Sequence, residues 1–110
     1  MNLPVTFRRS AESDLEGLYN FIAADNPEAA RRFTQRIRTY CERLTEFPER
    51  GSARPDLGAG MRIVGFERRV AIAFRILPDR VQIVGLFYGG RDFESHLSET
   101  FGSDDADPPR

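Results

Sequence analysis

Apolar and polar residues alternate at the start of the chain and again through its second half. Leu3, Val5 and Phe7 alternate with polar neighbours, which predicts a half-buried strand from Asn2 to Arg8. Three further segments with the character of β-strands follow, at 61–66, 70–77 and 81–88. The turn sequences between them are short, so these three strands are expected to pair antiparallel.

The alternation also predicts which side chains share a face of the sheet. The segment 70–77 places its larger apolar side chains on one face: Val70, Ile72, Phe74 and Ile76. Strict alternation along 81–88 puts three more side chains on one face: Val81, Ile83 and Phe87.

Between the first strand and these three, apolar residues recur at steps of three and four. This spacing predicts one helix over 11–24, with Ser10 as its N-cap. A second helix is predicted from the N-cap Asn26, with Pro27 at the first helical position, to about residue 47, where a proline stops it. The two-residue connection makes the two helices antiparallel neighbours.

The order strand, helix, helix, strand, strand, strand predicts a two-layer α+β fold. An antiparallel helical hairpin is expected to pack on a mainly antiparallel four-stranded sheet, in a single domain over 1–100. Whether the first strand lies at the edge or in the centre of the sheet stays open. A short helix is predicted at 92–98, and the acidic, proline-containing end, 101–110, is predicted to be disordered.

Composition narrows the classes of function. The 16 basic residues, all arginine, nearly balance the 17 acidic residues among the 110, unlike the strongly basic charge of an ordinary nucleic-acid binder. The longest apolar run, Val70–Phe74, is far shorter than the roughly 20 residues of a membrane span. One cysteine and one histidine cannot make a structural zinc site, and the lone Cys41 is compatible with a cytoplasmic protein. The all-arginine usage follows either from codon bias or from binding to anions.

Four stretches carry a resemblance to a known family. They are AESDLEGLYNFIAADNPEAARRF at 11–33, LTEFPERGSARPDL at 44–57, GMRIVGFERRVAIAFRI at 60–76 and VQIVGLFYGGRDF at 81–93. In this order and at this spacing they resemble the RelE/ParE superfamily of bacterial toxins from type II toxin–antitoxin systems. The resemblance covers residues 3–97 and is closer to the ParE type.

The resemblance to ParE implies a cytoplasmic toxin that inhibits DNA gyrase, blocks replication and arrests growth, as in plasmid stabilisation. It implies binding without catalysis, no cofactor or metal, and no sequence-specific DNA binding by this chain alone. It also implies a cognate antitoxin in a tight heterodimer or hetero-oligomer. The residues expected to contact gyrase are Arg91, Asp92, Phe93, Arg62 and Arg75.

Two alternatives stay open. A RelE-like, ribosome-dependent mRNA endoribonuclease would use Arg62, Arg75, Arg91 and His96. Arginine can hold a phosphate but is a poor base because of its high pKa. His96 is therefore either the general acid or base of such a site or an exposed residue of the short helix. The second alternative is a non-toxic half of a regulatory toxin–antitoxin complex.

Large apolar side chains outside the helical stripe are candidate antitoxin contacts. Phe21 falls off the apolar face of the first helix, and the consecutive residues Phe87 and Tyr88 point to opposite faces of their strand. The predicted antitoxin site comprises Phe21, Phe66, Phe87, Tyr88 and Arg54. The carboxylates, Asp14 among them, are expected at helix starts or on the solvated surface.

Overall fold

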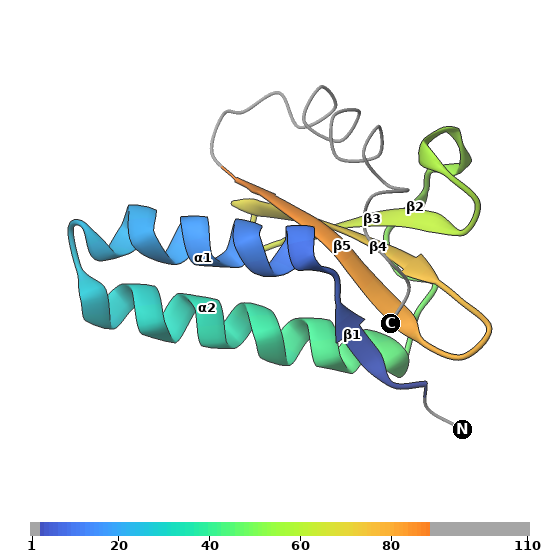
Figure 1. The fold of residues 1–110 in the computed structure, drawn as a ribbon, viewed down its shortest axis with the longest axis horizontal. Helices are drawn as coiled ribbons and strands as arrows, with labels where there is room; N and C mark the ends of the chain where they lie inside the picture. The colour runs from blue at the N-terminus through green and yellow to red at the C-terminus, as the bar shows by residue number, and fades with distance from the viewer. Residues whose placement is uncertain (1–2, 89–110) are drawn as a thin grey trace.

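The structure, a computed structural model, describes residues 3–88 (Figure 1). The predicted helix at 92–98 and the acidic end at 101–110 lie outside the described residues. The elements, in chain order, are the strand β1 (Val5–Phe7), the helices α1 (Arg9–Ala23) and α2 (Pro27–Glu42), the 3₁₀ turn η1 (Arg43–Thr45), the strand β2 (Ser52–Ala53), the 3₁₀ turn η2 (Pro55–Leu57), and the strands β3 (Met61–Phe66), β4 (Val70–Ile76) and β5 (Val81–Tyr88).

The two helices lie side by side as an antiparallel hairpin on one face of a five-stranded sheet (Figure 1). The strand order is β1-β5-β4-β3-β2, with β1 parallel to β5 and the other pairs antiparallel. The predicted α+β class is therefore confirmed. The sheet has one strand more than predicted, because Ser52–Ala53, within the expected loop, pairs with β3. The first strand, whose position was open, lies at an edge of the sheet.

The main core lies between the hairpin and the sheet. The buried stripe of the hairpin includes Leu15, Leu18, Phe33 and Ile37, which recur at the helical spacing that the sequence predicts. The facing sheet residues include Val70, Ile72 and Phe74, so the face predicted for β4 is confirmed. A smaller cluster, comprising Met61, Ala73, Val84 and Phe87, lies on the opposite face.

A β-bulge in β5 makes the predicted face of Phe87 wrong. Phe74 pairs with Ile83, but the preceding residue of β4, Ala73, pairs with Gly85. Val84 is thus the extra residue, and side chains beyond it change faces. Phe87 consequently lies in the smaller cluster, away from Val81 and Ile83, whereas Leu86 joins the main core.

Two polar side chains of α1 bind the backbone at this bulge. The Ser10 hydroxyl donates a hydrogen bond to the carbonyl oxygen of Val84 at 2.6 Å. The Asp14 carboxylate accepts one from the backbone N–H of Leu86 at 3.0 Å. The helix begins at Arg9, and Arg8 occupies the N-cap position. The predictions of a Ser10 cap and of a solvated Asp14 were wrong, because both side chains bind backbone groups of β5 beyond Ile83, the last residue that β1 pairs with.

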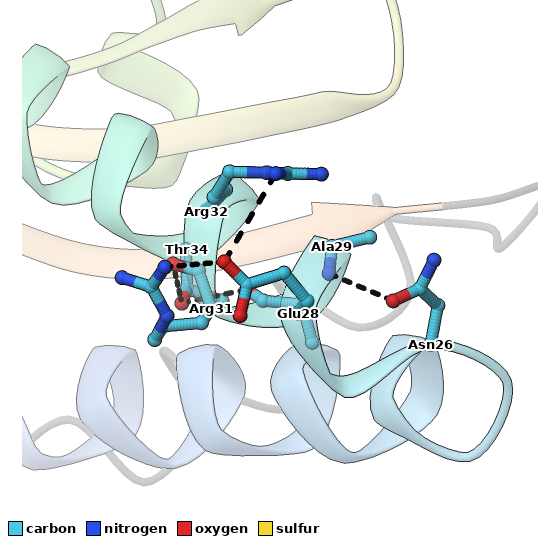
Figure 2. A network of polar contacts seen from close by, with 7 residues as sticks. Asn26, Glu28, Ala29, Arg31, Arg32 and Thr34 are labelled. Carbon is cyan, nitrogen blue, oxygen red and sulfur yellow. Dashed lines mark hydrogen bonds and ion pairs between the residues drawn. The ribbon is translucent and has the colours of Figure 1, made fainter.

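The second helix begins as predicted. Asn26 Oδ1 accepts a hydrogen bond from the backbone N–H of Ala29 at 3.1 Å (Figure 2). Pro27 is the first helical residue. The α-helix ends at Glu42, earlier than predicted, and the chain continues into the 3₁₀ turn η1 before Pro48.

Candidate functional site

A hollow opens where the tip of the helical hairpin meets the turn between β3 and β4; we call it the tip groove. Its first part has a volume of about 340 Å³, and its apolar lining includes Leu18, Phe21, Ile22, Phe33 and Tyr88. A second part, of about 390 Å³, shares Phe21, Ile22 and Phe33 with the first and continues along α2. Four arginines line the two parts: Arg32, Arg36, Arg68 and Arg69.

An exposed aromatic pair stands at the groove. Phe21 is 70% exposed, and its ring centroid lies 5.8 Å from that of Tyr88. The helix thus supplies one ring and the end of β5 the other. A phenylalanine left this open to water beside an apolar hollow is typical of a protein-binding surface, since covering it is favourable.

Two of the arginines that line the groove, Arg36 and Arg69, make contacts with a carboxylate or an aromatic ring. Arg36 makes two hydrogen bonds, both 2.9 Å, to the two carboxylate oxygens of Glu67, and these bonds lower the pKa of Glu67. The guanidinium groups of Arg36 and Arg69 also lie 5.1 and 5.9 Å from the ring centroid of Phe33. The groove therefore joins an apolar floor to a cationic rim.

Glu28 lies next to this rim, on the first turn of α2 (Figure 2). Its carboxylate pairs with Arg31 and lies 4.0 Å from Arg32. The hydrogen bond from Arg31 lowers the pKa of Glu28. Of the two arginines, Arg32 lines the tip groove and Arg31 does not.

The described residues predicted for gyrase contact or nuclease chemistry do not meet. In the register of β3 and β4, Arg62 lies opposite Phe74 and Arg75 lies opposite Met61. Directly opposed residues share a face of a sheet, and Phe74 and Met61 belong to the clusters on the two different faces. The two arginines therefore lie on opposite faces of the sheet. The Arg62 guanidinium donates hydrogen bonds to the carbonyl oxygens of Glu49, Arg50 and Gly51 at 2.6–3.2 Å, so it holds the loop before β2. The other predicted members, Arg91, Asp92, Phe93 and His96, lie outside the described residues.

The five residues predicted for antitoxin contact fall in four places. Phe21 and Tyr88 meet at the tip groove. Phe66 lies further along α2, with its ring centroid 5.0 Å from that of Tyr40. Phe87 is buried on the far face of the sheet, and Arg54 pairs with Asp56 at the start of η2.

Sequence reasoning missed the arginines of the rim. The charged turn sequence Glu67-Arg68-Arg69 and the i, i+4 pair Arg32 and Arg36 were the available signals. Neither signal indicates that α2 and the β3–β4 turn meet in space.

Other chemistry is sparse between residues 3 and 88. No cluster of three or more potential metal ligands occurs in that range, and no helix there is long and apolar enough to cross a membrane. Cys41 is buried, and loss of solvation raises the pKa of its thiol to about 12. Such a thiol is a poor nucleophile near neutral pH.

Comparison with known proteins identifies the family. Residues 5–93 match the family described as the ParE toxin of type II toxin–antitoxin system, parDE. A solved structure titled "Chromosomal ParDE TA system from P. aeruginosa" is similar, with a TM-score of 0.66 and 25% sequence identity, over 78% of this chain and 95% of that chain. The comparison with curated proteins gave no match. Since the family match spans most of the chain and the fold agrees with it, the chain belongs to the ParE toxins of type II toxin–antitoxin systems.

Proposed function

We propose that this ParE-type toxin arrests growth by inhibiting DNA gyrase in the cytoplasm, and that a cognate antitoxin inactivates it by covering the tip groove. The observation that carries the antitoxin part is the Phe21–Tyr88 pair, with Phe21 70% exposed above an apolar hollow. An aromatic side chain that becomes buried when a partner binds typically contributes a large share of the affinity of a protein interface.

The separation of Arg62 and Arg75 supports binding over RNA cleavage. A metal-free nuclease site needs cations and an acid or base that converge on one phosphate. Arg62 and Arg75 lie on opposite faces of the sheet, and Arg62 is bonded to loop carbonyls. We therefore assign the contact with gyrase to Arg91, Asp92 and Phe93, together with Arg75, and give Arg62 a structural role.

The gyrase proposal is tested by a supercoiling assay with purified gyrase and the full chain freed of antitoxin. We expect inhibition with trapped double-strand breaks, and loss of both in Arg91→Ala. Arg31→Ala, a matched exposed arginine paired with Glu28, should act like the wild type. If the folded wild-type protein leaves supercoiling unchanged, the gyrase proposal fails; mRNA cleavage on ribosomes, with its loss in His96→Ala, is then measured.

The antitoxin proposal is tested with Phe21→Ser. Because this change removes an exposed anchor and no core contact, growth arrest should persist while antitoxin affinity falls about 10- to 100-fold. The readout is growth during co-expression, together with the Kd of the purified complex. Phe47→Ser is the matched control, since Phe47 is 61% exposed and does not line the tip groove. Equal Kd values for the two variants would contradict the assignment.

A further inference from the structure

The turn between β3 and β4 has an unusual backbone for its sequence. The N–H of Arg69 donates to the carbonyl oxygen of Phe66 at 3.1 Å, which closes the turn. Glu67 and Arg68 between them have positive φ values of 52° and 60°. Two consecutive positive φ values are typical of the type I′ turn, where asparagine and glycine are the ordinary residues. Glutamate and arginine are strained there, and such strain is common at ligand-binding positions.

Each residue of this turn reaches the tip groove or its rim. Arg68 and Arg69 line the groove directly. Glu67 binds Arg36 through both carboxylate oxygens, which ties the turn to α2 beside the groove. The turn thus holds two guanidinium groups beside the apolar floor. An Asn-Gly pair at positions 67 and 68 would lack the guanidinium of Arg68 and the carboxylate that binds Arg36.

The charges around the groove specify the complementary ligand. Four arginines line its two parts, while Asp25 is the one carboxylate among its lining residues. Glu67 stands at the rim with both oxygens already hydrogen-bonded to Arg36. The surplus is cationic, and arginine binds carboxylates in a bidentate manner. The floor is built of aliphatic and aromatic side chains, which suits an apolar anchor.

We propose that the Glu67–Arg69 turn is a carboxylate clamp. It binds acidic side chains that flank the bulky apolar anchor of a protein segment seated in the tip groove. Where this segment belongs to the antitoxin, the inference rests on the proposed function; the binding chemistry itself is independent of gyrase. The strain at Glu67 and Arg68 is retained because it places Arg68 and Arg69 against that segment.

The first test uses two labelled synthetic peptides and the full chain freed of antitoxin. Both peptides are amphipathic and carry one phenylalanine and three leucines at helical spacing; one has glutamate at the flanking positions and the other glutamine. We expect the glutamate peptide to bind about tenfold more tightly in fluorescence anisotropy. Arg68→Ala and Arg69→Ala should each reduce this ratio strongly, and Arg31→Ala should leave it unchanged.

The second test separates recognition from stability. Arg68→Gly relieves one strained residue and removes one cation. It should raise the unfolding temperature by about 4–8 °C while weakening binding of the glutamate peptide several-fold. Arg68→Lys keeps both the charge and the strain, so its unfolding temperature should stay near that of the wild type. Tight peptide binding by a stabilised Arg68→Gly variant would overturn the clamp.

Two further outcomes would also overturn it. One is equal binding of the two peptides; the other is tighter binding of a labelled single-stranded 12-nucleotide DNA than of the glutamate peptide. Gyrase inhibition without peptide discrimination would remove the clamp and leave the proposed function intact. Peptide discrimination without gyrase inhibition would remove the gyrase proposal and leave the clamp intact.

Discussion

Asp14 is a polar residue whose role depends on one backbone group. Its half-buried carboxylate accepts the N–H of Leu86 beside the bulge of β5. Removing the carboxylate leaves that N–H with no acceptor from α1, and an unsatisfied buried donor is costly. Ser10, one helical turn earlier, donates its hydroxyl to the carbonyl oxygen of Val84. These two residues fix how α1 lies on the sheet.

We predict that Asp14→Ala lowers the free energy of unfolding by about 1–3 kcal/mol. Asp14→Asn keeps an acceptor oxygen and should lose less. Urea unfolding followed by circular dichroism measures both variants. Glu16→Ala, at an exposed position of the same helix, should change stability by no more than about 0.5 kcal/mol. An equal effect at both positions would show that the hydrogen bond between Asp14 and Leu86 does not stabilise the fold.

At the scale of elements, regular patterns were predictable and their interruption was not. The strands 61–66 and 81–88 agree with prediction because apolar residues bounded by turn sequences mark them well. The sequence VQIVGLFY has hydrophobic residues at nearly every position, so no polar side chain marks where Val84 reverses the faces. The role of Ser10 was hidden for the same reason, because it depends on that bulge.

The site shows the same division. Phe21 could be named from the sequence because it is a large ring off the apolar stripe of its helix. Tyr88 was named because it faces opposite to Phe87, and beyond the bulge this is the face of the main core. The cationic rim was not predictable, since the chain carries 16 arginines and pattern alone does not say which of them converge. Their convergence depends on the turn at Glu67 reaching α2, which is a tertiary contact.

Two glycines differ in the space around them: Gly85 lies where α1 packs on β5, and Gly17 lies on the open side of α1. A Cβ on Gly85 would lie 3.1 Å from Cζ of Phe87 and 3.2 Å from Oδ2 of Asp14, whereas one on Gly17 meets no atom within 4 Å. We expect Gly85→Ala to destabilise the fold by about 1–3 kcal/mol. Gly17→Ala should stabilise it by about 0.5–1 kcal/mol, because alanine favours a helix interior. Thermal unfolding measures the change in stability of both variants. Stabilisation by Gly85→Ala would show that the side chains of Phe87 and Asp14 leave room for a Cβ at this position.

At the scale of the whole molecule, surface ion pairs give stability a defined pH dependence. Arginine hydrogen bonds lower the pKa values of Glu28, Asp56 and Glu67 from their ordinary values of 4.5, 3.8 and 4.5. A carboxyl group whose pKa is lower in the folded state contributes stability that is present above its unfolded pKa. That contribution is lost as the pH falls through the folded pKa.

We therefore predict constant stability from pH 7 down to about 5 and a decline below about 4.5. The decline should be shallow, since the three groups are exposed and solvent screens them. Glu67→Gln should make it shallower, and added salt should reduce the stabilisation above pH 5. Urea unfolding at a series of pH values measures this; stability that rises on acidification would contradict the assignment.

The pairing of β1 with β5 determines at which stage of synthesis the chain can fold. Val5 and Val81 are partners although 76 positions separate them, and the helical hairpin packs on strands that follow it in the chain. A ribosome therefore releases β1, α1 and α2 before any surface that could cover their apolar stripe. Pairings between such distant segments form slowly and leave partly folded chains open to aggregation. The topology thus imposes a delay, because no folded toxin is present until its last strand has been translated.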